Sequence, residues 1–210
     1  MKTSTAFLLS LCLAAACQRG PGQGSSLRLD HANARNFLQK ANELYQVNDY
    51  PAAIQNYDLA LSLDPSLTAG YFNRGNARFK TRDLVGAIAD YDQTLRLDAE
   101  FADVHYNRAT ARFDAADYGE AVADYSVALR QDPYRTDARY NRGAAYYKLH
   151  NYKKALADFD RVIAARPDFA TVYNYRSKVK YALGDQPGAL VDYQTSLHLT
   201  SSLTAYALPD

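Results

Sequence analysis

Few side chains in this sequence have the type and spacing that catalysis or metal binding requires. The four histidines stand at unrelated positions, and no second His, Cys or Asp recurs beside them at a metal-ligand spacing. The serines lack the Gly-x-Ser-x-Gly pattern of a nucleophile elbow. The sequence therefore predicts a protein that is not an enzyme and that holds no metal and no cofactor.

One cysteine lies where a covalent modification is expected. It follows the segment MKTSTAFLLSLCLAAA, which has a positive charge at Lys2, a short apolar run and three closing alanines. This order is typical of a secretory signal peptide over residues 1–16, and the apolar run is too short to span a bilayer. Cys12 leaves with the signal, so Cys17 would be the only cysteine of the exported chain.

The residues around Cys17 resemble the lipobox of bacterial lipoproteins, in which the cysteine is acylated and becomes the new N-terminus. This sequence has Ala14 where that family usually has Leu. The resemblance implies a lipid anchor at Cys17, and Gln18 in place of Asp implies an outer membrane location facing the periplasm. Plain secretion, or a cytosolic protein with an apolar N-terminus, are the alternatives. Residues 17–30, rich in Gly and Ser, are expected to form the attachment site and a flexible tether.

The charge balance argues against nucleic acid as a partner. The chain has a net charge of +1, and loss of Lys2 with the signal leaves basic and acidic side chains equal in number. A basic patch or stripe is the usual electrostatic mark of a nucleic-acid-binding protein, and a polybasic run that of an anionic-membrane binder. The sequence has neither, so membrane attachment is expected only through Cys17.

A period of 34 residues organises the chain from Ala34 to Leu203, without insertion or deletion. Each repeat has a small residue, then an alanine, and an aromatic four residues after that alanine. The small residues are Ala41, Gly75, Ala109, Gly143 and Ser177; the alanines are Ala53, Ala87, Ala121, Ala155 and Ala189; the aromatics are Tyr57, Tyr91, Tyr125, Phe159 and Tyr193. Such regularity indicates a repeat protein.

Each repeat is expected to form two helices joined by a short turn. Apolar residues recur at helical spacing, and a residue able to cap the second helix stands in every repeat. These expected caps are Asp49, Asp83, Asp117, Asn151 and Asp185, and Pro65, Pro133 and Pro167 follow the second helix in three repeats. One hairpin cannot bury its apolar stripe alone, so the five must stack.

These positions resemble the tetratricopeptide repeat (TPR) family, and the likeness covers roughly four fifths of the chain. The sequence departs from the family pattern at Thr94, Ala99, Ser196 and Ser201. The resemblance implies an all-α fold, a right-handed TPR superhelix (α-solenoid) of five helical hairpins over residues 31–203. The expected repeats are 34–67, 68–101, 102–135, 136–169 and 170–203, followed by a C-terminal tail over 204–210.

A ladder of charged residues runs through repeats 2 to 5. The first helix of each carries an arginine and the second an aspartate sixteen residues later: Arg74 and Asp90, Arg108 and Asp124, Arg142 and Asp158, Arg176 and Asp192. Repeat 1 has Lys40 and Asn56 instead, so both members change together. This joint change favours structural ion pairs inside each hairpin rather than between neighbours; a charged stripe for a ligand is the alternative.

A second set of residues lies along the first helix of each repeat and combines aromatic rings with amides. By resemblance to TPR proteins these positions line a concave groove that binds extended peptides. The candidate groove residues are Gln39, Asn42, Tyr45, Phe72, Asn73, Asn76, Phe79, Tyr106, Asn107, Phe113, Tyr140, Asn141, Tyr147 and Tyr181. Carboxamides suit such a ligand because each offers a donor and an acceptor to a peptide bond. The alternative is that the aromatics merely pack between helices.

The expected function is a protein–protein interaction scaffold or adaptor of the bacterial cell envelope, with another protein or an extended peptide as its partner. The alternative is a structural assembly subunit, as in pilus or secretion machinery, that forms a homo-oligomer through its solenoid ends. The C-terminal edge bears on this alternative, because residues 201–210 are too few for an extra capping helix. Leu190 and Leu197 are expected to be covered either by Leu203, Tyr206 and Leu208 or by another protomer.

Overall fold

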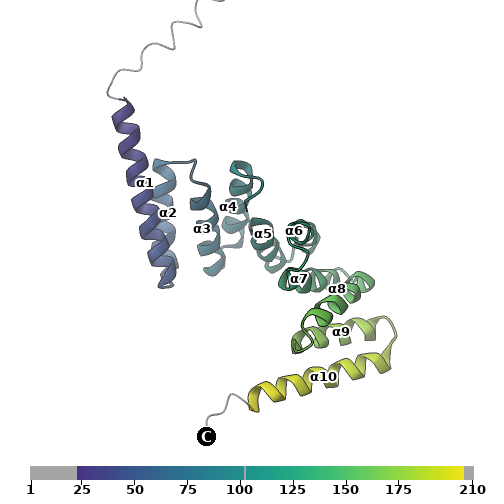
Figure 1. Cartoon of the computed structure of the whole chain (residues 1–210). Coiled ribbons are helices and arrows are strands. Elements are labelled where there is room, and N and C mark those ends of the chain that lie inside the picture. Colours follow the sequence, from purple (N-terminus) through teal and green to yellow (C-terminus); the bar gives the residue numbers. More distant parts are fainter. Residues whose placement is uncertain (1–22, 102, 206–210) are drawn as a thin grey trace, which may run out of the picture. The chain divides into compact units, whose positions relative to one another are not determined.

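The structure is a computed structural model that describes the backbone of residues 23–101 and 103–205 and the side chains of residues 30–201 apart from residue 102. These residues form ten α-helices, and within them no strand occurs (Figure 1). The helices are α1 Gln23–Gln46, α2 Tyr50–Leu63, α3 Thr68–Lys80, α4 Leu84–Leu97, α5 Val104–Asp114, α6 Tyr118–Gln131, α7 Thr136–Lys148, α8 Tyr152–Ala165, α9 Ala170–Ala182 and α10 Gln186–Ala205. The predicted signal peptide and Cys17 lie outside the described residues.

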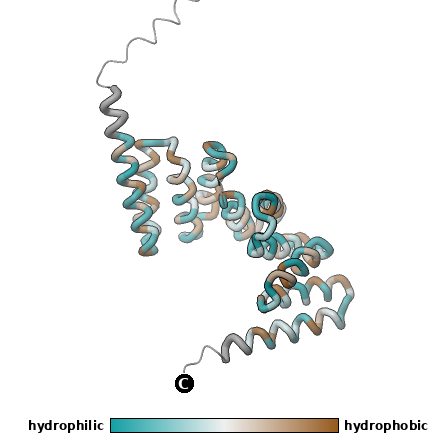
Figure 2. The backbone as a smooth tube through the Cα atoms, viewed as in Figure 1, coloured by the Kyte–Doolittle hydropathy of each residue, from teal (hydrophilic) through white to brown (hydrophobic). Residues whose placement is uncertain are grey.

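Consecutive helices pair into five hairpins, as the 34-residue period predicts, and the all-α class is confirmed for the described residues. The chain divides into two compact units, residues 1–70 and 71–210. The first contains the α1/α2 hairpin, and the second contains α4 to α10 with most of α3. Each helix carries both hydrophobic and hydrophilic residues (Figure 2), as expected of helices that pack on one face and meet water on another.

The turn inside each hairpin uses one residue in the left-handed region of backbone space. These residues are 34 apart: Asn48, Arg82, Ala116, His150 and Gly184, with φ of 62°, 67°, 63°, 57° and 87°. Only the last is glycine, the residue that adopts this conformation without a steric penalty from Cβ. The turn geometry is therefore set by the fold in four hairpins and favoured by the residue in the fifth.

The predicted helix caps are only partly confirmed. The side chains of Asp49, Asp83 and Asp185 accept a hydrogen bond from the backbone N–H three residues later, at 3.2, 2.9 and 2.9 Å. Asp117 and Asn151 occupy the same position but make no such bond. The prediction that they cap α6 and α8 through their side chains is therefore wrong, although their backbone carbonyls do begin the helices.

The core is built from the alanine and the aromatic that recur in the second helix of the first four hairpins. Ala87, Ala121 and Ala155 have no exposed surface, and Tyr125 and Phe159 are equally buried. Each ring rests on the small residue of the first helix: a Cβ added to Gly143 would lie 2.8 Å from the Phe159 ring. The small residue is therefore a packing requirement, because it lets the aromatic ring approach the helix backbone.

The last helix is longer than the other second helices. α2, α4, α6 and α8 each have 14 residues, whereas α10 has 20 and passes the predicted end of the fifth repeat at residue 203. After α2 and α4 the aspartates Asp64 and Asp98 accept a bond from the N–H two residues on, which turns the chain. Thr200 stands at that position in α10 and instead donates to the Ser196 carbonyl within the helix.

The first helix begins earlier than the sequence suggested. Residues 17–30 were expected to be a flexible tether, but α1 starts at Gln23, so the second half of that segment is helical. Gly and Ser are weak helix formers, but they do not prevent a helix where the following residues propagate it. The rest of the expected tether lies outside the described residues.

Candidate functional site

The four arginine–aspartate pairs form inside the hairpins, in the arrangement predicted from the sequence. In each, the guanidinium donates two hydrogen bonds to the two carboxylate oxygens, between 2.6 and 3.0 Å: Arg74 to Asp90, Arg108 to Asp124, Arg142 to Asp158 and Arg176 to Asp192. All four aspartates are buried. Such bidentate pairs join the first helix to the second with a fixed geometry.

Each buried aspartate also lies near a second cation from the first helix. Arg78 bonds Asp90 at 2.8 Å, Arg112 bonds Asp124 at 2.7 Å, and Lys180 lies 2.9 Å from Asp192, whereas Arg139 is 3.9 Å from Asp158. Burial opposes ionisation of Asp192, but the bonds from Arg176 and Lys180 outweigh it and lower the pKa of its carboxyl group.

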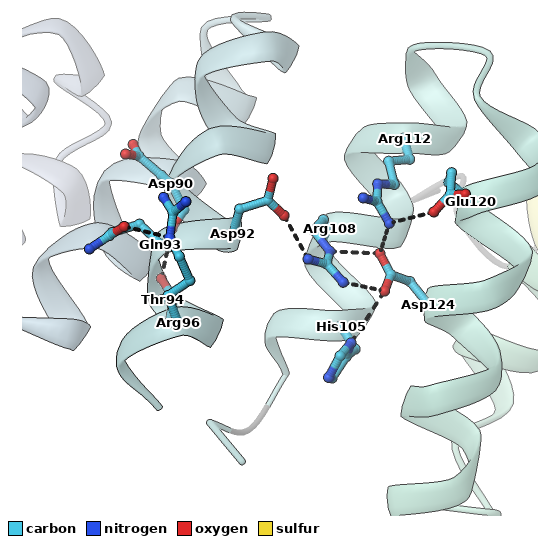
Figure 3. Close-up of polar contacts among 10 residues, drawn as sticks. All are labelled: Asp90, Asp92, Gln93, Thr94, Arg96, His105, Arg108, Arg112, Glu120 and Asp124. Atoms are coloured by element: carbon cyan, nitrogen blue, oxygen red, sulfur yellow. Dashed lines mark hydrogen bonds and ion pairs between the residues drawn. The ribbon is translucent and has the colours of Figure 1, made fainter. Parts of the chain in front are cut away.

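The arginines also link neighbouring hairpins, which the sequence reasoning did not expect. Arg108 donates to Asp92 of the preceding hairpin at 2.6 Å while it holds Asp124 of its own (Figure 3). Arg142 reaches Ser126 at 3.1 Å, and Arg176 reaches Asp160 at 2.7 Å, in the same way. The predicted pairing of the ladder residues inside each hairpin is confirmed, and these further bonds to the preceding hairpin were not predicted. The sequence contains a signal for these bonds between hairpins, because polar residues stand 34 apart at Asp92, Ser126 and Asp160.

Most amides of the predicted groove bond to another amide or to a tyrosine. Asn107 donates to the Asn76 oxygen at 2.9 Å, and Asn141 donates to the Tyr106 hydroxyl at 3.3 Å, so both bonds link one hairpin to the next. Asn76 also accepts from Tyr91 at 2.8 Å. Asn73 is half-buried beside them. In the first unit Gln39 donates to Glu43 and Asn42 accepts from Tyr57. These amides therefore have a structural role.

The aromatics near the start of the first helices are covered by the turn that follows each hairpin. The ring of Phe72 lies 5.1 Å from that of Phe101, and Tyr140 lies 5.0 Å from Phe169. At the same place the Arg135 guanidinium stacks on Tyr106, 3.8 Å from the ring centre. The three groove rings are half-buried, so packing accounts for much of their presence in the sequence.

The aromatics near the end of the first helices pack on the start of the second. Tyr45, Phe113 and Tyr147 each meet a tyrosine five residues later, at 5.3, 5.3 and 6.0 Å between ring centres. Phe79 packs against the core around Tyr91. Five residues after Tyr181 stands Gln186, where the other hairpins have a tyrosine or a leucine. The Tyr181 side chain therefore lacks an apolar neighbour at this position and is 68% exposed.

Burial raises the pKa of two groove phenols, those of Tyr106 and Tyr140. It raises the pKa of Tyr140 to about 12, with a further contribution from Tyr175, and it raises the pKa of Tyr106 above its ordinary value. These hydroxyls can therefore donate as well as accept hydrogen bonds, but none is activated as a nucleophile or base.

One cavity of about 530 Å³ includes two of the predicted groove residues. Tyr147 and Tyr181 line it together with Tyr152, Lys178, Leu190 and Tyr193. It lies between the fourth and fifth hairpins and is mainly aromatic. Sequence reasoning missed Tyr175, which stands in the fifth repeat at the position of the amides and packs within 6 Å of the rings of Tyr140 and Tyr147.

Within residues 30–201, apart from residue 102, no group of His, Cys and carboxylate side chains is placed to hold a metal ion. No helix in the described part of the chain is long and apolar enough to cross a bilayer. His105 lies 3.2 Å from Asp124 and belongs to the network around Arg108 (Figure 3).

Three family models of tetratricopeptide repeats match the chain, over residues 41–81, 72–136 and 136–169. Together they span more than half of its length, and the hairpins have the sequence pattern described above. The chain belongs to the tetratricopeptide repeat family. No curated protein matches the sequence.

Solved structures with this fold confirm the class. A crystal structure of MamA superposes with a TM-score of 0.77 at 19% identity, over 85% of this chain and 97% of that one. A MamA fragment from Desulfovibrio magneticus superposes with a TM-score of 0.77 at 14% identity, over 81% of this chain and 96% of the fragment. YrrB, described as "a TPR protein with an unusual peptide-binding site", superposes with a TM-score of 0.73 at 23% identity, over 82% of this chain and 91% of YrrB. At these identities the similarity establishes the fold.

Proposed function

We propose that this chain is a protein-interaction scaffold that binds an extended peptide or a partner protein along its first helices. The observation that carries this proposal is the file of half-buried amides at Asn76, Asn107 and Asn141, beside half-buried rings. Each carboxamide has two N–H donors and an oxygen acceptor, so the bonds to neighbours described above leave each amide further capacity for a ligand. TPR membership supports the same function.

A selection from random displayed peptides tests this proposal on the purified chain. Peptides that bind should lose affinity when Asn107 and Asn141 are both replaced by Ala, by roughly 0.5–1.5 kcal/mol for each lost hydrogen bond. The matched control replaces two exposed amides of α1, Asn33→Ala with Asn36→Ala, and should bind as before.

The amides also link hairpins, so the double variant is expected to lose some stability, and binding must be measured well below its melting temperature. If no displayed peptide binds, or if the two double variants bind a selected peptide equally well, the groove proposal fails.

We further propose that the scaffold is exported and anchored in the cell envelope, at the outer membrane facing the periplasm, through acyl chains on Cys17. The support is the signal-like segment followed by a lipobox-like run of residues. Two or more acyl chains give stable anchoring, whereas one chain alone binds only marginally. The Cys17→Ala variant should move from the membrane fraction to the soluble periplasmic fraction. Equal membrane partition of both forms would refute the anchor.

The second candidate, a structural assembly subunit that oligomerises through its end, is favoured by one observation. Leu190 and Leu197 of α10 are each more than half exposed.

A further inference from the structure

The last helix has an apolar face that no part of the described chain covers. Leu190, Tyr193 and Leu197 are 57%, 46% and 53% exposed. They are spaced i, i+3 and i+7, which places them on one side of α10. Exposed apolar residues that gather in this way mark interaction surfaces more often than isolated ones do.

The preceding hairpin shows what this face is built to pack against. One repeat earlier the same positions are Leu156, Phe159 and Ile163 of α8, and Phe159 is fully buried there. The first helix of the next hairpin, α9, covers them with Val172, Tyr175 and Val179, which are again spaced i, i+3 and i+7.

The cavity beside α10 corresponds to the space that Tyr175 fills one repeat earlier. The ring of Tyr175 lies 5.9 Å from Tyr147 and 5.8 Å from Phe159. The residues equivalent to Tyr147 and Phe159 in the next repeat, 34 positions later, are Tyr181 and Tyr193, and both line the cavity. The cavity is therefore a place for an aromatic ring carried by a packed helix.

A second α10 carries the side chains that such a helix needs. Leu190, Tyr193 and Leu197 repeat the spacing of the α9 residues: an apolar residue, a tyrosine three residues on and an apolar residue four further on. The only charged side chain of α10 is Asp192, which is 2% exposed and already paired with Arg176 and Lys180. Two copies of the face can therefore meet without repulsion between charges.

The opposite end of the chain does not offer a suitable surface. The residues of α1 at the positions of Val172, Tyr175 and Val179 are Asn36, Gln39 and Glu43, and all three are exposed. To cover α10 with this surface would bury polar groups and a carboxylate without partners, which is costly. Head-to-tail assembly is disfavoured for this reason.

We propose that the chain forms a tail-to-tail dimer in which the face of α10 defined by Leu190, Tyr193 and Leu197 packs against the same face of a second copy. The contact is isologous, so it closes after two chains and places Tyr193 of each copy at the cavity of the other. This interface lies on α10 and shares only Tyr147 and Tyr181 with the predicted groove, whose amides Asn76, Asn107 and Asn141 lie on α3, α5 and α7. The dimer therefore presents two copies of that groove.

Light scattering coupled to size-exclusion chromatography, from micromolar to hundreds of micromolar, tests the dimer. The wild-type chain should show twice the monomer mass and dissociate on dilution, and Leu190→Asp should weaken association about a hundredfold or more because it places like charges in an apolar contact. Leu197→Asp should act alike, so the test does not rest on one variant. The matched control, Val85→Asp, changes an exposed apolar residue of α4 and should leave the dimer intact.

Each other result contradicts the proposal. A wild-type chain that stays monomeric at every concentration refutes it, as does a mass that grows beyond two chains. A dimer that survives Leu190→Asp or Leu197→Asp, with helicity unchanged by circular dichroism, places the contact elsewhere. Because the chain has no Trp, Tyr193→Trp adds a local probe: its emission should shift to the blue as the chain associates, and a constant spectrum would refute the placement of the interface.

Discussion

The fourth and fifth hairpins have the same sequence pattern but differ in how far their second helices are buried. Phe159 of α8 is fully buried, whereas Tyr193, its counterpart in α10, is 46% exposed. The ion pairs do not differ in this way: Asp158 and Asp192 are both buried, and each receives two bonds from its arginine.

This comparison separates two sources of stability in the array. The arginine–aspartate pair belongs mainly to one hairpin, so it survives at the end of the chain. The burial of the aromatic face belongs to the contact between hairpins, so it is smaller in α10, which no further helix of the described chain covers. The fifth hairpin is thus complete in its internal ion pair but exposed on the outer face of α10.

The largest expected effect is the loss of the inner ring. Phe159→Ala should destabilise the chain by about 3–5 kcal/mol, because it empties a packed site between two hairpins. Tyr193→Ala should cost about 1 kcal/mol or less, since much of the ring is already in water. Denaturant unfolding of both variants measures the difference. Equal costs would show that α10 is as well covered as α8.

The ion pairs should behave alike in the two hairpins. Alanine at Asp158 or at Asp192 leaves arginine charge partly buried without its partner, and each should cost on the order of 3 kcal/mol. Removing Arg142 together with Asp158, or Arg176 together with Asp192, should cost clearly less than the sum of the single changes. Double-mutant cycles by urea unfolding give both coupling energies. Additive effects in either hairpin would mean that its pair is solvated.

Acid should weaken the terminal pair. The pKa of Asp192 is lowered in the folded chain, so the unfolded chain binds the proton more readily. Its stabilisation is therefore complete above the ordinary aspartate range near pH 4 and is lost as the pH falls through the folded value. Asp192→Asn should be less stable than the wild type at pH 7, and the difference should shrink toward pH 3. Melting temperatures over this range measure it, and a constant difference would contradict the lowered pKa.

The smallest expected effects concern the turns inside the hairpins. Ala116 has a φ of 63°, which is strained for a residue with a Cβ, so Ala116→Gly should stabilise the chain by up to about 1 kcal/mol. Gly184 stands at the same place in the last hairpin with a φ of 87°, and Gly184→Ala should destabilise by a similar amount. The control is Ala115→Gly, at φ −79°, where glycine brings no relief of strain. Thermal melts should show a higher melting temperature for Ala116→Gly and a lower one for Gly184→Ala. A change in the same direction for both variants would contradict the prediction.

The features that the sequence predicted well are those that repeat inside one hairpin. The ten helices, the buried alanine and aromatic, and the four arginine–aspartate pairs all depend on spacings of a few to sixteen residues. Such spacings are fixed by helix geometry alone, so they can be counted along the chain.

The features that it missed depend on how hairpins meet or end. The partner of Arg108 at Asp92 and the coverage of Tyr106 by Arg135 come from neighbouring hairpins, whose contacts no single helix period fixes. The amides were predicted to bind a ligand because their bonding partners could not be seen in the sequence. The bonds of Asn107 and Asn141 go to residues of the preceding hairpin, and the spacing within one helix does not reveal them. The early start of α1 was missed because its first residues include the weak helix formers Gly and Ser, and the length of α10 was missed because Thr200 replaces the aspartate that turns the chain in earlier repeats.

The most direct measurement is hydrogen exchange of α8 and α10 in the same dilute sample, at a concentration where the chain is monomeric. Amides of Tyr152–Ala165 should exchange only when hairpins separate, whereas those in the C-terminal half of α10 should exchange orders of magnitude faster, because local opening there breaks few packed contacts. Mass spectrometry of peptides from both helices reads the two rates. Protection of α10 equal to that of α8 in the dilute monomer would contradict the account, because it would require a cover for Leu190, Tyr193 and Leu197 from within the chain.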